Sequence, residues 1–284
     1  MKTLKELWRD RRFAIGASVL LVLAALALLS FFSPYNPKEM RVVPRDLPPS
    51  MEYYLGTNSL GQDVFWQMTV AIRNSLVVAF VAAFISRIIA MLVGLVAGYL
   101  GGVVDRVLMF INDGFIVLPL LLILVLLALL VQEQLSLLML AVLFGVMGWA
   151  VDSRFIRSQV LSLREREFTY TAILNDTPTI KLVVKEYLLF IIPLALATLF
   201  GNMIWVIGME ITLAYLGLTD VTIPTLGSML HFAINYQAIL LGLWWWLAAP
   251  IGVSVALFVA LYLVFMSVGE YLDPRARIQR VGTR

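Results

Sequence analysis

The chain lacks cysteine, has a single histidine and carries few charged residues. Without cysteine it has no disulfide, thiolate metal site or cysteine nucleophile. His231 alone cannot build a multi-histidine metal centre. None of the five lysines follows a glycine, whereas a phosphate-binding Walker A loop requires Gly-Lys-Ser/Thr. No Ser-His-Asp or paired-carboxylate arrangement stands out either, so we predict no catalytic residue, no metal site and no cofactor in this chain.

The scarcity of charge has a second consequence. Only 14% of the 284 residues are charged and 61% are hydrophobic, against roughly 25% and 45–50% in soluble domains. Such an excess of apolar residues requires lipid as solvent. The net charge of +3 gives no sign of a nucleic-acid partner. We therefore predict an all-α integral membrane protein embedded in the lipid bilayer.

Apolar runs indicate about six transmembrane helices, because a bilayer core needs about 20 apolar residues in a helix. The expected spans are residues 13–32, 75–99, 106–131, 135–151, 187–216 and 240–268. The first run lacks an Ala-x-Ala site at its end, which favours an uncleaved span over a signal peptide.

Two stretches between these runs are expected to lie outside the membrane. Residues 33–73 contain five prolines and are expected to form a loop or small cap, and residues 220–238 a loop with a short helix. We divide the chain into a segment 1–74, containing the first span and this loop, and a core transmembrane domain 75–284.

Positive charge is unevenly distributed between the loops. With six spans, 16 of the 21 Lys and Arg residues lie on the side that holds both chain ends and residues 152–186. The opposite side holds Lys38, Arg41 and Arg45. Because positively charged loops stay in the cytoplasm, we predict that the N- and C-termini are cytoplasmic.

Three ionisable residues lie within the expected spans: Arg87, Asp113 and Glu210. Burial of charge in a membrane is costly, so each is a candidate for the translocation path. Arg87 could instead form a structural ion pair with Asp113 or Glu210, snorkel to the interface, or contact an anionic solute group. Asp113 could be a helix-packing residue. Small residues that permit close helix approach are also frequent: Gly94, Gly98, Gly145, Gly148, Gly201 and Gly208.

The charged stretch 152–186 is expected to be a cytoplasmic loop. Apolar residues recur at helical spacing in its first part, so the fourth span should continue as an amphipathic helix. Pro178 interrupts the chain, and Asp176 or Thr177 could cap a second helix. Such a projecting element is suited to docking a cytoplasmic partner, although a solvated loop without a partner is the alternative.

Several segments resemble one known family. They are residues 55–64 (LGTNSLGQDV), 97–102 (AGYLGG), 159–168 (QVLSLREREF), 210–218 (EITLAYLGL) and 224–230 (PTLGSML), with LDPR at 272–275. From about residue 8 to 277 their order and spacing resemble the inner-membrane permeases of the dipeptide/oligopeptide/nickel branch of ABC importers. The resemblance implies the type I permease fold in a prokaryotic inner (plasma) membrane.

The resemblance also implies partners and a substrate class. Such permeases pair with a second homologous permease, two ABC ATPases that bind ATP and Mg, and an extracytoplasmic solute-binding protein. Di- and oligopeptides are the default substrate, with oligosaccharides, nickel or other small solutes as alternatives. A stand-alone secondary transporter or channel remains a further alternative, for which helices broken at mid-membrane and inverted repeats would be evidence; no convincing repeat is visible. A membrane-embedded enzyme is another alternative to an importer permease, and the absence of a recognisable set of catalytic residues argues against it.

By resemblance, a coupling helix in the 152–186 loop inserts into an ATPase groove. The expected ATPase-coupling residues are Phe168, Thr169, Tyr170, Thr171, Ala172, Ile173, Leu174, Asn175, Asp176 and Thr177. The family pattern here is Glu-Ala-Ala followed by Gly, whereas this chain has Tyr170-Thr171-Ala172 and Asp176. Asp tolerates unusual backbone angles better than most residues, so we expect the turn to be compatible with it.

Overall fold

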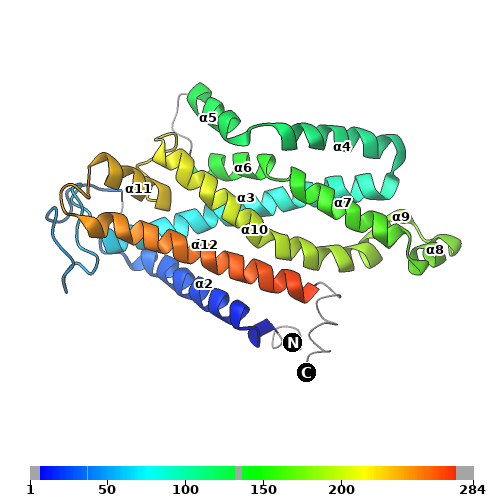
Figure 1. The fold of residues 1–284 in the computed structure, drawn as a ribbon, viewed down its shortest axis with the longest axis horizontal. Coiled ribbons are helices and arrows are strands. Elements are labelled where there is room, and N and C mark those ends of the chain that lie inside the picture. Colours follow the sequence, from blue (N-terminus) through cyan, green and yellow to red (C-terminus); the bar gives the residue numbers. More distant parts are fainter. Residues whose placement is uncertain (1–6, 37, 132–135, 273–284) are drawn as a thin grey trace.

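The computed structural model describes residues 7–36, 38–131 and 136–272, which are mainly helical (Figure 1). Within these ranges four helices are long and apolar enough to cross a membrane, or up to six spans are present if each of two bent helix pairs is one span. The expected outer turn at 132–134 and the tail from residue 273 lie outside the described residues.

The first and last spans lie side by side (Figure 1). Helix α2 (Arg11–Leu29) continues into the short η1 (Ser30–Phe32), and α12 covers Trp244–Leu272. The guanidinium of Arg12 lies 2.8 Å from the carboxylate of Glu270. The start of α2 and the end of α12 are therefore at the same end of the bundle.

Helix α3 (Val64–Leu100, 37 residues) begins well before the predicted start of the second span at residue 75. Asp63 caps it by accepting hydrogen bonds from the backbone N–H groups of Phe65 and Trp66. Burial raises the pKa of the Asp63 carboxyl, and these two bonds oppose that shift. Residues 64–73 were expected to belong to the loop or cap 33–73, but they begin this helix, and the Gln67 side chain is buried in an amide network with Asn58 and Gln62.

The third and fourth predicted spans are both bent. Helices α4 (Gly102–Val117) and α5 (Leu120–Val131) meet at 80°, and α6 (Leu137–Met147) and α7 (Ala150–Arg164) meet at 43°. Pro119 accounts for the first break, because proline lacks an N–H donor and disfavours helix at the residue before it. Helix α7 extends the fourth span to Arg164, which confirms the predicted amphipathic continuation.

A short helix α8 (Glu167–Leu174) follows, and then α9 (Thr179–Leu182), a π-helical turn η2 (Val183–Tyr187) and α10 (Leu188–Tyr215) form one continuous stretch. Pro178 is the N-cap residue of α9 and no side chain caps it, so the predicted capping by Asp176 or Thr177 is wrong. The short helix expected within 220–238 is present as α11 (Leu226–Asn235).

Helix α3 is central to the packing and contacts α2, α6, α7 and α10. Gly94 and Gly98 of α3 lie against α7, where a Cβ atom would come within 2.7 Å of Ser153 O and of Val160 Cβ, respectively. Gly145 likewise lies close to α3, whereas a Cβ atom added at Gly208 would meet no atom within 4 Å. The prediction of close packing is thus confirmed at the first three glycines and wrong at Gly208.

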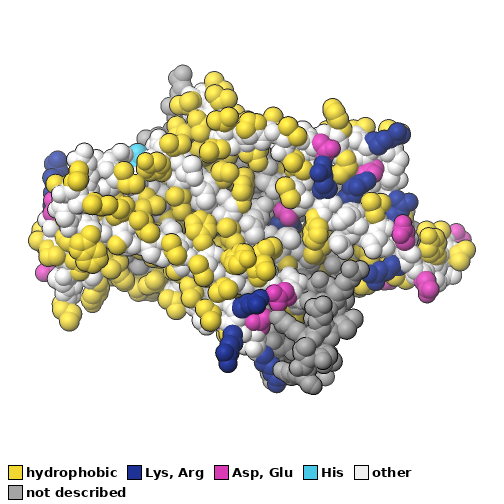
Figure 2. Space-filling model, in the orientation of Figure 1, with side chains coloured by type: hydrophobic (Ala, Val, Ile, Leu, Met, Phe, Trp, Pro, Cys, Tyr) yellow, Lys and Arg dark blue, Asp and Glu magenta, His cyan; other side chains and the backbone are white. Residues whose placement is uncertain are grey.

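Apolar side chains dominate the middle of the molecule, while charged side chains gather near α7–α9 (Figure 2). Many large apolar residues of the long helices are exposed, among them Phe80 and Phe84 of α3. This distribution is that of a protein surrounded by lipid or by other membrane subunits. The proposed division at residue 74 remains a prediction, and its boundary lies inside α3.

Candidate coupling helix and translocation site

Helix α8 has an inner face that packs against the membrane domain. Thr169 is buried, donates a hydrogen bond to Leu163 O at 2.8 Å and lies 3.2 Å from the Tyr187 hydroxyl. The Phe168 ring stacks on Phe190 with a centroid separation of 5.9 Å. Ala172 is partly buried on the same side. These contacts join α8 to η2 and to the start of α10.

The outer face of α8 is apolar and exposed. Tyr170 and Ile173 are each 57% exposed, and Leu174 is 84% exposed. Exposed apolar side chains that cluster at one place indicate an interaction site. The sequence placed residues 168–177 together in one coupling element, and the structure separates them into a packed face and a free face.

The turn after α8 explains how Asp176 substitutes for glycine. Its φ is +49°, in the left-handed region that favours glycine. The N–H of Asp176 donates to Ile173 O and the N–H of Thr177 donates to Ala172 O, each at 3.0 Å. This is the hydrogen-bond pattern of the Schellman motif, so the expected turn is present with Asp176 in place of glycine.

Arg87 lies on α3 and is only 4% exposed. Its ion-pair partner is Asp152 of α7, with Nη2 and Oδ2 3.0 Å apart. The predicted partners Asp113 and Glu210 are therefore wrong. Asp152 was missed because it stands at the start of the charged loop, where sequence alone suggests solvent. The contact with Asp152 is an ion pair without hydrogen-bond geometry, and no other described residue forms a hydrogen bond with the guanidinium nitrogens of Arg87.

Asp113 lies on α4 and pairs with Arg154 of α7, both about half exposed. Eight residues before Asp113 on α4, Asp105 forms a two-bond ion pair with Arg157, which lies three residues after Arg154 on α7. Asp113 therefore joins α4 to α7, which agrees with its alternative reading as a helix-contact residue. Its role in a translocation path stays a prediction.

Glu210 is buried in α10 and links three helices. The Ser75 hydroxyl of α3 donates to its carboxylate at 3.2 Å and accepts from Leu226 N at 3.1 Å. Leu226 is the first residue of α11, and the neighbouring Thr225 and Ser228 form a capping box. The partial positive charge at the start of a helix favours a nearby carboxylate. Glu210 thus holds α11 against α3 and α10.

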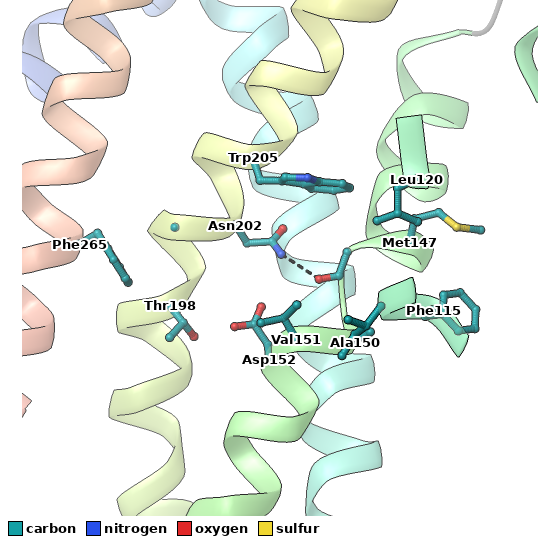
Figure 3. Close-up of a pocket in the computed structure, with 13 residues that line it drawn as sticks. Phe115, Leu120, Met147, Ala150, Val151, Asp152, Thr198, Asn202, Trp205 and Phe265 are labelled. Atoms are coloured by element: carbon teal, nitrogen blue, oxygen red, sulfur yellow. Dashed lines mark hydrogen bonds between the residues drawn. The ribbon is translucent and has the colours of Figure 1, made fainter. Parts of the chain in front are cut away.

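A cavity of about 310 Å³ lies where the two bent helix pairs meet α10 (Figure 3). Its polar lining comes from Asp152, Thr198 and Asn202, and its apolar lining includes Phe115, Met147, Trp205 and Phe265. Asn202 donates from Nδ2 to Gly148 O and to Ser86 Oγ, each at 3.2 Å. Of the three predicted path residues, Arg87 is the one connected with this cavity, through Asp152.

Long apolar helices, two bent helix pairs and a projecting helix with an exposed apolar face define a multi-pass membrane protein. The family model described as "Binding-protein-dependent transport system inner membrane component" matches residues 90–278. The chain belongs to this family. This confirms the resemblance, and the two bent helix pairs therefore do not indicate a stand-alone secondary transporter.

Curated relatives agree over nearly the whole chain. The oligopeptide transport system permease protein OppC of Mycobacterium tuberculosis (strain H37Rv) is 28% identical over 96% of each chain. The dipeptide transport system permease protein DppC of Bacillus subtilis is 29% identical over 96% of this chain and 85% of its own. The nickel transport system permease protein NikC of Escherichia coli K12 is 31% identical over 90% and 92%. The protein is thus an inner-membrane permease subunit of an ABC importer.

Proposed function

We propose that this chain forms half of the translocation path of an importer for di- and oligopeptides. A second homologous permease forms the other half, and an extracytoplasmic solute-binding protein delivers the solute. Two cytoplasmic ABC ATPases bind ATP and Mg and carry out the hydrolysis, so this chain is a non-catalytic subunit. The names of the oligopeptide and dipeptide relatives support peptides as substrate, while the nickel relative keeps another solute open.

The observation that carries this proposal is the exposed apolar face of α8. Tyr170, Ile173 and Leu174 lie at the opposite end of the bundle from residues 38–63, the segment before α3 (Figure 1). An apolar face of this kind suits docking in a groove of an ATPase. Because α8 packs on the start of α10, movement of the ATPase would reach the spans around the cavity.

The proposed orientation places both chain ends and α8 in the cytoplasm. The start of α2 and the end of α12 point toward the α8 end of the molecule (Figure 1), where many of the charged side chains gather (Figure 2). This supports the same orientation as the positive-inside rule. Cysteine introduced at Ser158 should react with a membrane-impermeant maleimide only after the cells are opened, and cysteine at Met51 should react in intact cells. The chain has no native cysteine, so no background labelling arises from it.

The test of coupling is the variant Leu174→Glu. Burying a leucine side chain contributes about 2 kcal/mol, so a charge at this position should weaken ATPase binding by roughly 30-fold or more. The measurement is the ratio of ATPase to permease recovered by mild-detergent purification. Leu174 is a sharper choice than Ala172, because Ala172 is partly buried and a bulky charge there would also disturb the packing of α8.

The matched control is Met51→Glu, which places the same charge at a 94% exposed apolar position near the other end of the bundle. It should retain the ATPases. Equal recovery of ATPases with both variants would contradict the assignment of α8 as the coupling helix. Recovery of the wild-type chain without any ATPase would contradict the proposed partners.

A further inference from the structure

The connection between α11 and α12 exposes an apolar tip at the end of the bundle opposite α8 (Figure 1). Residues 236–243 form a series of turns. At the tip of this loop, Ile239, Leu240 and Leu241 are 66%, 80% and 61% exposed. Three consecutive large apolar side chains are rarely exposed together on a surface that faces water unless they serve a function. The tip, residues 239–241, is therefore a candidate interaction surface.

The backbone N–H groups of this loop find partners within the loop. The N–H of Leu243 donates to Ala238 O at 2.8 Å, and both residues are buried, so the loop closes at its base. Nearer the tip, the N–H groups of Leu240 and Leu241 both donate to Gln237 O, at 2.9 and 3.2 Å. Lipid excludes backbone groups that have no partner. A loop with paired donors can therefore approach the acyl chains at little cost.

Charge distinguishes this loop from the segment 38–63 at the same end of the molecule. A hydrogen bond of 3.2 Å from Trp245 Nε1 to Thr57 O ties the start of α12 to that segment. Residues 221–269 contain no Asp, Glu, Lys or Arg. The docking surface of a soluble protein generally has a polar rim, which the tip lacks. The segment 38–63, in contrast, exposes the charged residues Lys38, Glu39, Arg41, Arg45, Asp46 and Glu52.

The tip also continues the outward face of a membrane-spanning helix. Helix α12 is long and apolar enough to cross a membrane. Its first residue, Trp244, is 63% exposed, and Val255 and Tyr262 are exposed on the same face at helical spacing. Trp245 and Trp246 are buried, so Trp244 is the residue of this run whose indole faces outward. Because tryptophan favours the boundary between hydrocarbon and headgroups, this boundary lies at the start of α12, next to the tip.

We propose that the tip inserts into the membrane leaflet at this end of the protein. The partner is the lipid surface: the three apolar side chains enter the upper part of the acyl region, and the internally paired backbone stays near the headgroups. Helix α11 ends at Asn235, directly before the loop, and packs against α10 and α12. Insertion of the tip therefore holds α11 at the membrane surface. This inference depends on the membrane location of the family and not on the substrate or the ATPases.

The test places a fluorophore on the tip of the complete transporter in phosphatidylcholine nanodiscs. Leu240→Cys is labelled with the environment-sensitive dye NBD; this chain has no native cysteine, and the partner subunits are made cysteine-free. Emission is compared between plain lipid and lipid that carries a nitroxide near the top of its acyl chain. The label should lose about half of its emission, because an interfacial segment lies roughly 5–10 Å into the boundary.

The matched control is Arg45→Cys, an exposed position in the charged segment at the same end. Its label should keep its emission in the nitroxide lipid. Quenching of this label as strong as that at Leu240→Cys would overturn the proposal, because the whole end of the molecule and not the tip would then lie in lipid. If Leu240→Cys does not assemble, Leu241→Cys on the same tip decides, with the same expected loss of emission.

Equal emission of the tip label in both lipids would also overturn the proposal, and the colour of the emission then identifies what covers the tip. A blue shift that appears only after the solute-binding protein is added would assign the tip to that protein. A blue-shifted emission that is present from the start would assign it to the second permease. Peptide uptake and ATPase recovery do not enter these measurements, so this proposal and the proposed function can fail independently.

Discussion

The contact between α3 and α7 allows a test in which one type of substitution should have opposite effects at two positions. Gly94→Ala introduces a methyl group whose carbon would lie 2.7 Å from Ser153 O and 2.8 Å from Ile156 Cβ. Neither neighbour is the end of a flexible side chain, so the two helices would have to separate. Gly208→Ala adds the same methyl group to α10, where no atom lies within 4 Å.

The magnitudes follow from two opposing effects. Replacing glycine by alanine in a helix stabilises it by up to about 1 kcal/mol. Overpacking a close contact costs typically about 1–3 kcal/mol. Gly94→Ala should therefore lower the free energy of unfolding by about 1 kcal/mol. Gly208→Ala should raise it by up to about the same amount.

The assay is equilibrium unfolding in mixed micelles, followed by tryptophan fluorescence and far-UV circular dichroism. Gly98→Ala serves as a second close-contact variant, because its Cβ would lie 2.7 Å from Val160 Cβ. The midpoints of Gly94→Ala and Gly208→Ala should shift in opposite directions relative to the wild type. Shifts of the same sign and size would refute the conclusion that the α3–α7 distance is set by these glycines.

Three further predictions concern single positions. Asp176→Gly should preserve or raise the amount of ATPase recovered with the permease in mild detergent, because a residue other than glycine in the left-handed conformation costs about 1 kcal/mol. Asp176→Val should lower the amount of ATPase recovered in the same purification. Asp63→Ala should cost about 1 kcal/mol as a lost helix cap, whereas Asp63→Asn retains the cap. Because burial raises the pKa of Asp63, the wild type should lose stability relative to Asp63→Asn as the pH rises through the acid range, and pH-dependent unfolding of both proteins checks the sign. Asp152→Asn should destabilise the chain by about 3 kcal/mol, because it leaves the Arg87 charge unpaired; adding Arg87→Met should restore most of the loss, and a double variant no more stable than Asp152→Asn would contradict the pairing.

Much of the membrane architecture could be predicted from the sequence. Long apolar runs predicted the spans, because hydrophobic length is a property of the chain itself. The amphipathic continuation into α7 and the short α11 were also readable from local pattern. The turn at Asp176 and the proposed coupling element were expected through the resemblance to a family motif, although the resemblance did not say which residues face outward.

Other features depend on three-dimensional packing. Residues 64–73 form the first turns of α3, where Gln67 is buried in an amide network with Asn58 and Gln62, and sequence alone does not show that these three side chains meet. The 80° bend between α4 and α5 lies within one apolar run, and hydropathy measures the length of such a run but not its direction.

For the charged and polar residues too, sequence gave part of the answer and three-dimensional packing gave the rest. The sequence by itself placed Arg87 within an expected span, where an isolated charge is costly, and left open an ion pair, snorkelling to the interface or a contact with an anionic solute group. Only the tertiary structure decided that the partner is Asp152. It also brought Asn202 of α10 to the cavity that Asp152 lines, 50 positions away in the chain. The physical reason is that burial cost depends on the local residue and its surroundings, whereas pairing depends on which helices pack together.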